Sequence, residues 1–155
     1  MGGTVKAGAY PGPSDGNKFV MLQKTGSPKV SFFDANKVGA ALGTSSKGME
    51  NVVSSSTSII KNNVCNSGNI DRWSSVGAID SVMVMISTAS DKESNSADFC
   101  TIYRALGITN ALRLDGGGST GMMINNQLLN PNTGSKRVVF GDMRHIPYAL
   151  KIYRK

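Results

Sequence analysis

The sequence predicts a single α+β domain, in which a mixed, largely antiparallel β-sheet packs against one or two helices. Composition is the first support, because 18 glycines and many Ser, Thr and Asn residues among 155 favour turns and strands over a helix bundle. Spacing is the second, because short apolar runs alternate with turn residues and one stretch has helical periodicity. We expect an irregular N-terminal segment over 1–16, which contains Pro11 and Pro13, and one domain over 17–155.

The first half of the chain predicts a hairpin, a short helix, a loop and a strand. Apolar runs at 19–23 and 29–33 flank a Thr-Gly-Ser-Pro turn, which is typical of a hairpin. A helix over 34–42 would have an Asp at its N-cap and a Gly after its end. The Ser-rich stretch 43–58 predicts a surface loop. A strand then starts near Thr57, contains two isoleucines and stops at an Asn-Asn pair.

The second half predicts a tight hairpin and one amphipathic helix. Runs at 76–79 and 82–87 flank an Asp-Ser turn, whereas the stretch 88–95 predicts a loop. Ser96 is the expected N-cap of the helix and Gly107 the expected residue after its end. Four apolar positions spaced i, i+3, i+4 and i+7 predict its buried face: Phe99, Ile102, Tyr103 and Leu106.

Further strands are expected after this helix. The segment 111–114 predicts a buried strand, and 122–124 and 127–129 predict a hairpin around an Asn-Asn turn. The stretch 148–153 alternates strictly and predicts a last strand.

Charge and hydropathy exclude several classes of function. The net charge is +7, but the basic residues are spread along the chain without aromatic interleaving, so nucleic acid is not expected as a partner. A solvated basic surface is favoured over an electropositive rim for a phosphate-containing substrate. No apolar stretch of about 18 residues occurs, and we expect no membrane span. No signal peptide is visible, which is compatible with a cytosolic chain, a lost leader or a fragment.

The cysteines and the histidine limit the possible chemistry. Cys65 and Cys100 are compatible with free buried thiols or with a disulfide, and two thiols do not make a structural zinc site. His145 is the sole histidine, so any Ser–His or Cys–His pair must use it. Nothing in the sequence demands a metal or another cofactor.

The segment 115–120, Asp-Gly-Gly-Gly-Ser-Thr, is the strongest candidate for an active site. Asp115 follows a predicted buried strand, where a carboxylate costs free energy unless it binds or reacts. Three glycines allow close approach of a ligand and positive φ, and their N–H groups can form an anion-binding nest. Two hydroxyl groups follow. A structural glycine-rich hairpin is the alternative on physical grounds alone. The candidate ligand groups are Gly116, Gly117, Gly118, Ser119 and Thr120.

The run from Ala105 to Thr120, with Leu-Gly, Asn-Ala-Leu-Arg-Leu and Asp-Gly-Gly-Gly-Ser, resembles the signature of the phosphodiester glycosidase family. That family includes N-acetylglucosamine-1-phosphodiester α-N-acetylglucosaminidase and bacterial exopolysaccharide-associated proteins. The segment Arg144–Leu150 is similar to the family's closing segment. The resemblance is clearest over 56–153.

The resemblance implies a hydrolase that cleaves a glycosyl phosphodiester, with a carbohydrate or glycosyl phosphate as substrate. Our hypothesis is that Asp115 acts as acid/base or stabilises developing charge. His145 is the candidate proton carrier, with a structural role as the favoured alternative. The glycine turn, Ser119, Arg144 and, as the weaker candidate, Arg72 would hold the phosphate, with an ordinary surface ion pair as the alternative for each arginine. We expect a secreted, cell-surface or phage-associated protein of undetermined oligomeric state.

The chain departs from the family pattern at three places. Trp73 stands where the family has Arg, with Arg72 one position earlier, and Tyr148 stands where it has Asn. The family's N-terminal Asn-Gly-Gly segment is matched at most by Met1-Gly2-Gly3. These departures favour an alternative function, a non-catalytic glycan-binding or structural module of a larger surface or phage protein.

Overall fold

The computed structural model describes residues 19–24, 26, 29–34, 49–55, 57–66, 68, 70–89, 92–114, 116–117, 120–124 and 127–130. Within these residues every strand pair is antiparallel and one helix is present, so the α+β prediction is correct at this level. Of the predicted helix over 34–42, only Asp34 is described, and it is the last residue of β2. The predicted strand over 148–153 and the segment 1–16 lie outside the described residues. Among the described residues, no helix has the length and hydropathy of a membrane span.

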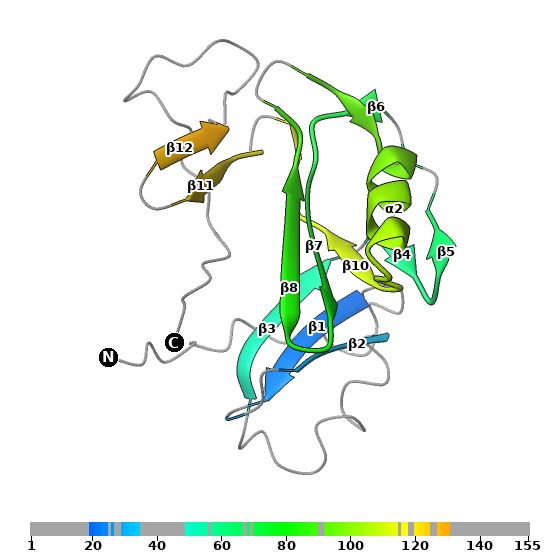
Figure 1. Ribbon diagram of the computed structural model, residues 1–155, viewed down its shortest axis with the longest axis vertical. Coiled ribbons are helices and arrows are strands. Elements are labelled where there is room, and N and C mark those ends of the chain that lie inside the picture. The colour runs from blue at the N-terminus through cyan, green and yellow to red at the C-terminus, as the bar shows by residue number, and fades with distance from the viewer. Residues whose placement is uncertain are drawn as a thin grey trace.

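Two larger sheets form the framework (Figure 1). A three-stranded sheet has the order β2-β1-β3, with β1 at Phe19–Lys24, β2 at Val30–Asp34 and β3 at Met49–Ser55. A five-stranded sheet has the order β5-β4-β10-β7-β8. Its strands are β4 (Ser58–Lys61), β5 (Val64–Cys65), β7 (Ser74–Ile79), β8 (Val82–Ser87) and β10 (Ala111–Arg113).

Three shorter elements complete the described fold. Helix α2 spans Ser96–Ala105, with Asn95 as the N-cap in a capping box and Gly107 at a φ of 74° after its end. Strands β6 (Ile70–Asp71) and β9 (Ser94–Asn95) pair beside the N-terminus of α2. Strands β11 (Met122–Ile124) and β12 (Gln127–Asn130) form the predicted hairpin.

The first hydrophobic core lies between α2 and one face of the five-stranded sheet. Tyr103 is fully buried, and its hydroxyl lies 2.8 Å from Ser75 Oγ of β7. Burial raises the pKa of Tyr103 well above its usual value, an effect that the Ser75 hydroxyl partly opposes. Gly77 faces this tyrosine, and a Cβ there would lie 2.8 Å from the ring. This core consists of Ile59, Ile60, Trp73, Phe99, Cys100, Tyr103, Ile108 and Ala111.

The second core lies between the two larger sheets. Because adjacent strand residues face opposite sides, Ala111 of β10 packs in the first core and Leu112 in the second. Likewise Val84 and Ile86 of β8 contact the first core, and its methionines contact the second. The buried members of the second core are Met21, Val76 and Leu112. The five-stranded sheet is therefore the middle layer, between α2 and the three-stranded sheet.

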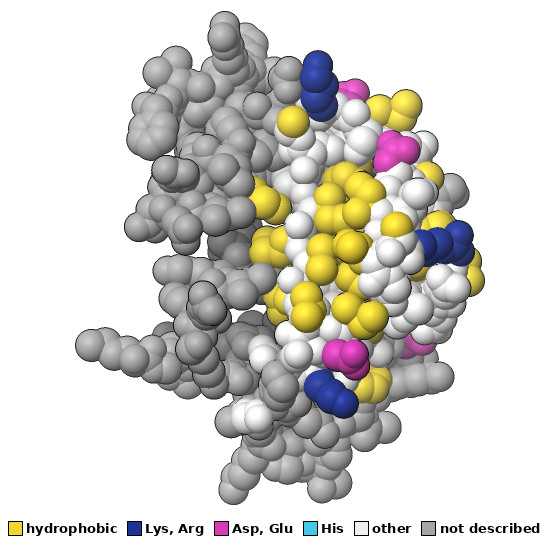
Figure 2. Space-filling view, in the orientation of Figure 1, with side chains coloured by type: hydrophobic (Ala, Val, Ile, Leu, Met, Phe, Trp, Pro, Cys, Tyr) yellow, Lys and Arg dark blue, Asp and Glu magenta, His cyan; other side chains and the backbone are white. Residues whose placement is uncertain are grey.

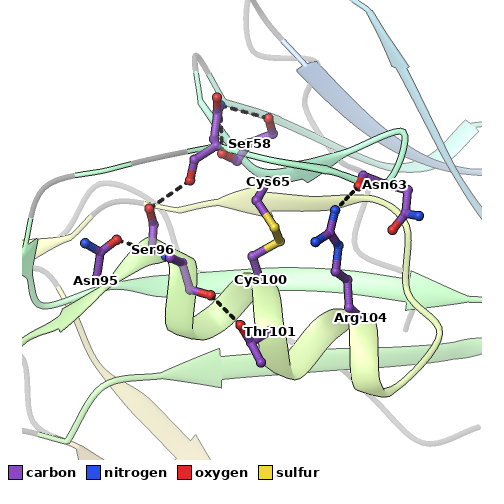
Figure 3. Close-up of a disulfide and its surroundings, with 10 residues drawn as sticks. Ser58, Asn63, Cys65, Asn95, Ser96, Cys100, Thr101 and Arg104 are labelled. Carbon is purple, nitrogen blue, oxygen red and sulfur yellow. Dashed lines mark hydrogen bonds between the residues drawn. A yellow bond between two sulfur atoms is a disulfide. The ribbon is translucent and has the colours of Figure 1, made fainter.

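A disulfide ties α2 to the edge of the middle layer. Cys65 of β5 and Cys100 of α2 are bonded, with 5.8 Å between their Cα atoms (Figure 3). One turn further along, the Arg104 guanidinium donates to the carbonyl of Asn63, beside the same strand. Of the two states that the sequence left open for the cysteines, the structure has the bonded one.

Strand β8 is an apolar edge. Among the described residues it pairs only with β7, on one side. Figure 2 shows hydrophobic side chains gathered on the face where β8 lies in Figure 1. Ile79 and Val82, at the turn between β7 and β8, are exposed. An edge of this composition is a surface on which another strand can pair.

The structure corrects several sequence-based expectations. The stretch 49–55, expected in a loop, is strand β3 on β1, and 94–95 of another expected loop is strand β9. The N-cap of α2 is Asn95, one residue before the expected Ser96. The buried face of α2 also differs from the prediction, because Ile102 and Leu106 are about half exposed. Ser96 and Cys100 are buried there instead, next to Phe99 and Tyr103.

Candidate active site

The glycine turn begins where β10 ends, and it is held against the chain that leads into β7. The N–H of Leu114 donates to the carbonyl of Ser74 at 2.7 Å, which extends the β10–β7 pairing by one step. The N–H of Gly117 then donates to the carbonyl of Arg72 at 2.8 Å. Backbone hydrogen bonds to residues 72–74 therefore hold both Leu114 and Gly117 in place.

Two glycines are required in this turn for different reasons. A Cβ on Gly116 would lie 2.7 Å from the carbonyl oxygen of Arg72 and 3.0 Å from the ring of Trp73, too close for any side chain. Gly117 has a φ of 56°, in the left-handed region that glycine adopts without steric cost. The expected positive φ therefore occurs at Gly117, and the expected close approach occurs at Gly116.

Two N–H groups of the turn are already hydrogen-bonded within the protein and cannot contribute to the predicted anion-binding nest. The N–H of Gly117 is already bonded to Arg72, and the N–H of Thr120 donates to the carbonyl of Gly117 at 3.2 Å. Neither N–H is therefore available for an anion in this conformation. Gly117 instead serves by its conformation and by its lack of a side chain.

Trp73 packs against the glycine turn at Gly116. Its side chain is buried, and its Nε1–H donates to the carbonyl of Ser94 at 2.9 Å. Its backbone N–H donates to Thr88 Oγ1 at 3.0 Å. The guanidinium of Arg113 lies over the Trp73 ring, 4.5 Å from its centroid. Trp73 is thus a core residue, which fits core packing better than stacking on a sugar.

Two hydroxyl groups near the turn are buried without a protein partner. Thr120 is 1% exposed, and its Oγ1 has no hydrogen-bond partner. Ser94 Oγ is also buried and unpartnered, on the strand that pairs with Asp71. An unsatisfied buried hydroxyl costs about 1–3 kcal/mol, so such groups are expected where a ligand supplies the missing bond.

The structure brings together part of the predicted site. Gly116, Gly117 and Thr120 lie in one turn, and the backbone of Arg72 holds that turn. Five predicted site residues lie outside the described part of the chain: Asp115, Gly118, Ser119, Arg144 and His145.

Sequence reasoning missed Asp71 in this region. Its two carboxylate oxygens lie 3.9 Å from the position of a Cβ on Gly117. The signal available in the sequence was its place directly before Arg72, which had been singled out for the phosphate. Within the described residues no three His, Cys, Asp or Glu side chains come together as a metal site.

Comparisons with known proteins agree with the glycine signature. A family model described as phosphodiester glycosidase matches residues 1–153, which include the glycine turn and residues 71–73. A search of curated proteins found no match. A crystal structure of a hypothetical protein from Synechocystis aligns with a TM-score of 0.41 and 16% identity, over 74% of this chain and 31% of that one. The chain thus spans less than a third of that protein's length.

Proposed function

Because the chain belongs to the phosphodiester glycosidase family, we propose that it hydrolyses the bond between the anomeric carbon of a sugar and a phosphodiester oxygen. The products are a free sugar and a phosphate monoester. The proposed substrate class is a sugar-1-phosphodiester in a glycan or glycoconjugate, with an N-acetylglucosamine-1-phosphodiester as the first member to test.

The observation that carries this proposal is the turn at Gly116 and Gly117. It lacks side chains where it packs on residues 72–73, and a buried, unpartnered Thr120 hydroxyl follows it. A purely structural hairpin has no need of an unsatisfied hydroxyl, whereas a binding site for an oxygen-rich ligand does. Sugars and phosphates both offer many oxygen atoms to such a group.

The proposed roles follow the order of the chemistry. Asp115 stabilises the positive charge that develops at the anomeric carbon, or exchanges a proton there. A phosphate is a better leaving group than an alcohol, so its oxygen needs little protonation. The proposed role of His145 is to carry the proton that is exchanged during the reaction. Positive and hydroxyl groups hold the phosphate, with arginine favoured for its two-pronged hydrogen bonding. The proposed phosphate-binding residues are Arg72, Gly116, Gly118, Ser119, Thr120 and Arg144, with the hydroxyl as the binding group of Thr120. Gly117 shapes the turn.

A second candidate function is a glycan-binding module without turnover. It is favoured by Trp73, which stands where the family pattern has Arg and is buried in the core. A hydrophobic ring at this position cannot bind phosphate. In this alternative the glycine turn recognises a glycan, and the chain acts as part of a larger surface or phage protein.

The test is release of sugar from a panel of sugar-1-phosphodiesters by the wild type and by Asp115→Asn. We expect turnover by the wild type and a loss of about 100-fold or more in kcat for the variant. Asp80→Asn is the matched control, since Asp80 lies in the β7–β8 turn at a φ of 51°, which Asn tolerates. Sugar binding by a folded wild type without any turnover would establish the second candidate instead.

A further inference from the structure

The carboxylate of Asp71, which lies in the β6–β9 pair, is close to the glycine turn. Asp71 ends β6, and its Oδ1 accepts a hydrogen bond from the N–H of Arg72 at 2.7 Å. Both carboxylate oxygens lie 3.9 Å from the position of a Cβ on Gly117. Among the described residues other than Gly117 and its chain neighbours, these oxygens are the only heavy atoms within 4 Å of that position. The Asp71 carboxylate is therefore within van der Waals distance of the space that a Gly117 side chain would take.

Three other carboxylates of the described part serve other purposes or lie elsewhere, and Glu93, directly before Ser94, is exposed. Asp34 forms an ion pair with Lys61, and Asp98 Oδ2 accepts from the N–H of Asn95 in the capping box of α2. Asp80 lies at the far end of β7 from the glycine turn. Asp71 is thus the described carboxylate whose position is tied to the turn by contact.

A buried hydroxyl without a partner lies next to Asp71. Ser94 is directly opposite Asp71 in the β6–β9 pair, so the two side chains project from the same side of that pair. Ser94 Oγ is nevertheless buried and bonded to no protein atom. Cβ atoms of directly opposite residues lie about 4.5–5.5 Å apart, so the Ser94 hydroxyl lies beside the Asp71 side chain. Thr120, whose N–H donates to the carbonyl of Gly117, supplies a second buried hydroxyl without a partner.

We infer that Asp71 is the second carboxylate of the active site and that it activates the water that attacks the sugar. This inference rests on the proposed glycosidase function. Glycoside cleavage uses two carboxyl groups in most families, and a phosphate leaving group needs little help from an acid. A second carboxylate is then of most use as a base.

The proposed hydrolysis is a single displacement at the anomeric carbon. The water oxygen forms a bond to the anomeric carbon while a water proton passes to a carboxylate oxygen of Asp71. The bond between that carbon and the phosphodiester oxygen breaks, and its electron pair leaves with the phosphate monoester. Asp71 then releases the proton to solvent. A direct attack of this kind inverts the configuration at the anomeric carbon.

The experiment compares the wild type, Asp71→Asn and Asp80→Asn on the best sugar-1-phosphodiester of the panel. Asn retains an Oδ1 that can accept from the N–H of Arg72, so Asp71→Asn keeps the local hydrogen bond. We expect kcat to fall by about 100-fold or more while KM changes by less than about threefold. Asp80→Asn stays at the wild-type rate. Added azide restores turnover of Asp71→Asn and yields a glycosyl azide, because azide attacks without a base.

Each failure has its own signature. A wild type with no turnover on any substrate overturns the proposed glycosidase function, and with it the role of Asp71. An active wild type with an equally active Asp71→Asn overturns the role of Asp71 alone. Retention of configuration in the wild-type product, read by NMR before mutarotation, also overturns its role as the base for water.

Discussion

Replacing Gly116 by Ala tests whether the glycine turn is shaped by contact with residues 72–73. The added Cβ would lie 2.7 Å from the carbonyl oxygen of Arg72 and 3.0 Å from the ring of Trp73. Ordinary contacts between such atoms are about 3.5 Å or longer. The turn, or residues 72–73 before β7, must therefore move by several tenths of an ångström. Neither neighbour can rotate away, since one is backbone and the other is a buried ring.

The expected cost is that of overpacking a rigid site, about 2 kcal/mol. For a chain of this length that loss lowers Tm by about 4–8 °C, which thermal unfolding followed by circular dichroism measures readily. Gly26→Ala is the matched control, because Gly26 has a φ of 74° but no atom within 4 Å of its Cβ position. Its cost is the backbone term alone, about 1 kcal/mol. A Gly116→Ala variant that is no less stable than Gly26→Ala would refute the reasoning.

The remaining predictions concern the disulfide and the buried tyrosine. Reduction of Cys65–Cys100, which closes a loop over a sequence separation of 35, lowers the unfolding free energy by about 4 kcal/mol by loop entropy; urea unfolding with and without reductant checks this, and a change below about 1 kcal/mol contradicts it. Burial raises the pKa of Tyr103 in the folded protein. Its contribution to the free energy of unfolding is therefore constant below its unfolded pKa of about 10, and above that pH it falls by about 1.4 kcal/mol per pH unit. Tyr103→Phe should therefore flatten the loss of stability above pH about 10, and an unchanged slope would rule this out.

The fold was predictable where a local pattern coincides with a tertiary role. The Asp80 turn and the Gly107 helix end are both visible in the chain, because each needs a residue that tolerates positive φ. Strand β3 was not visible, since its Met-Glu-Asn-Val-Val-Ser-Ser sequence has no alternation and its pairing with β1 decides its state. Strands β6 and β9 have two residues each, too few for any periodicity.

The buried face of α2 was predictable only in part. Phe99 and Tyr103 follow the helical stripe and are buried. Ile102 and Leu106 follow the same stripe but are half exposed, because the buried face runs through Ser96 and Cys100 instead. The bond of Cys100 to Cys65 is a long-range pairing that the helical spacing does not show.

The candidate site divides in the same way. The glycine run is a local signature and was visible from the sequence, as was its tolerance of positive φ, which the structure uses at Gly117. The approach of Asp71 to Gly117 was not visible, because it depends on the β6–β9 register and on the hydrogen bond from Gly117 to Arg72. Neither of these long-range pairings leaves a mark on the spacing of residues.

Hydrolysis in water labelled with oxygen-18 tests the central claim most directly, since it shows which bond is broken. A sugar-1-phosphodiester is cleaved by the wild type, and both products are weighed by mass spectrometry. The account predicts the label in the released sugar, because water attacks the anomeric carbon. Label in the phosphate monoester would mean that phosphorus is attacked, and the chain would then be a phosphodiesterase and not a glycosidase.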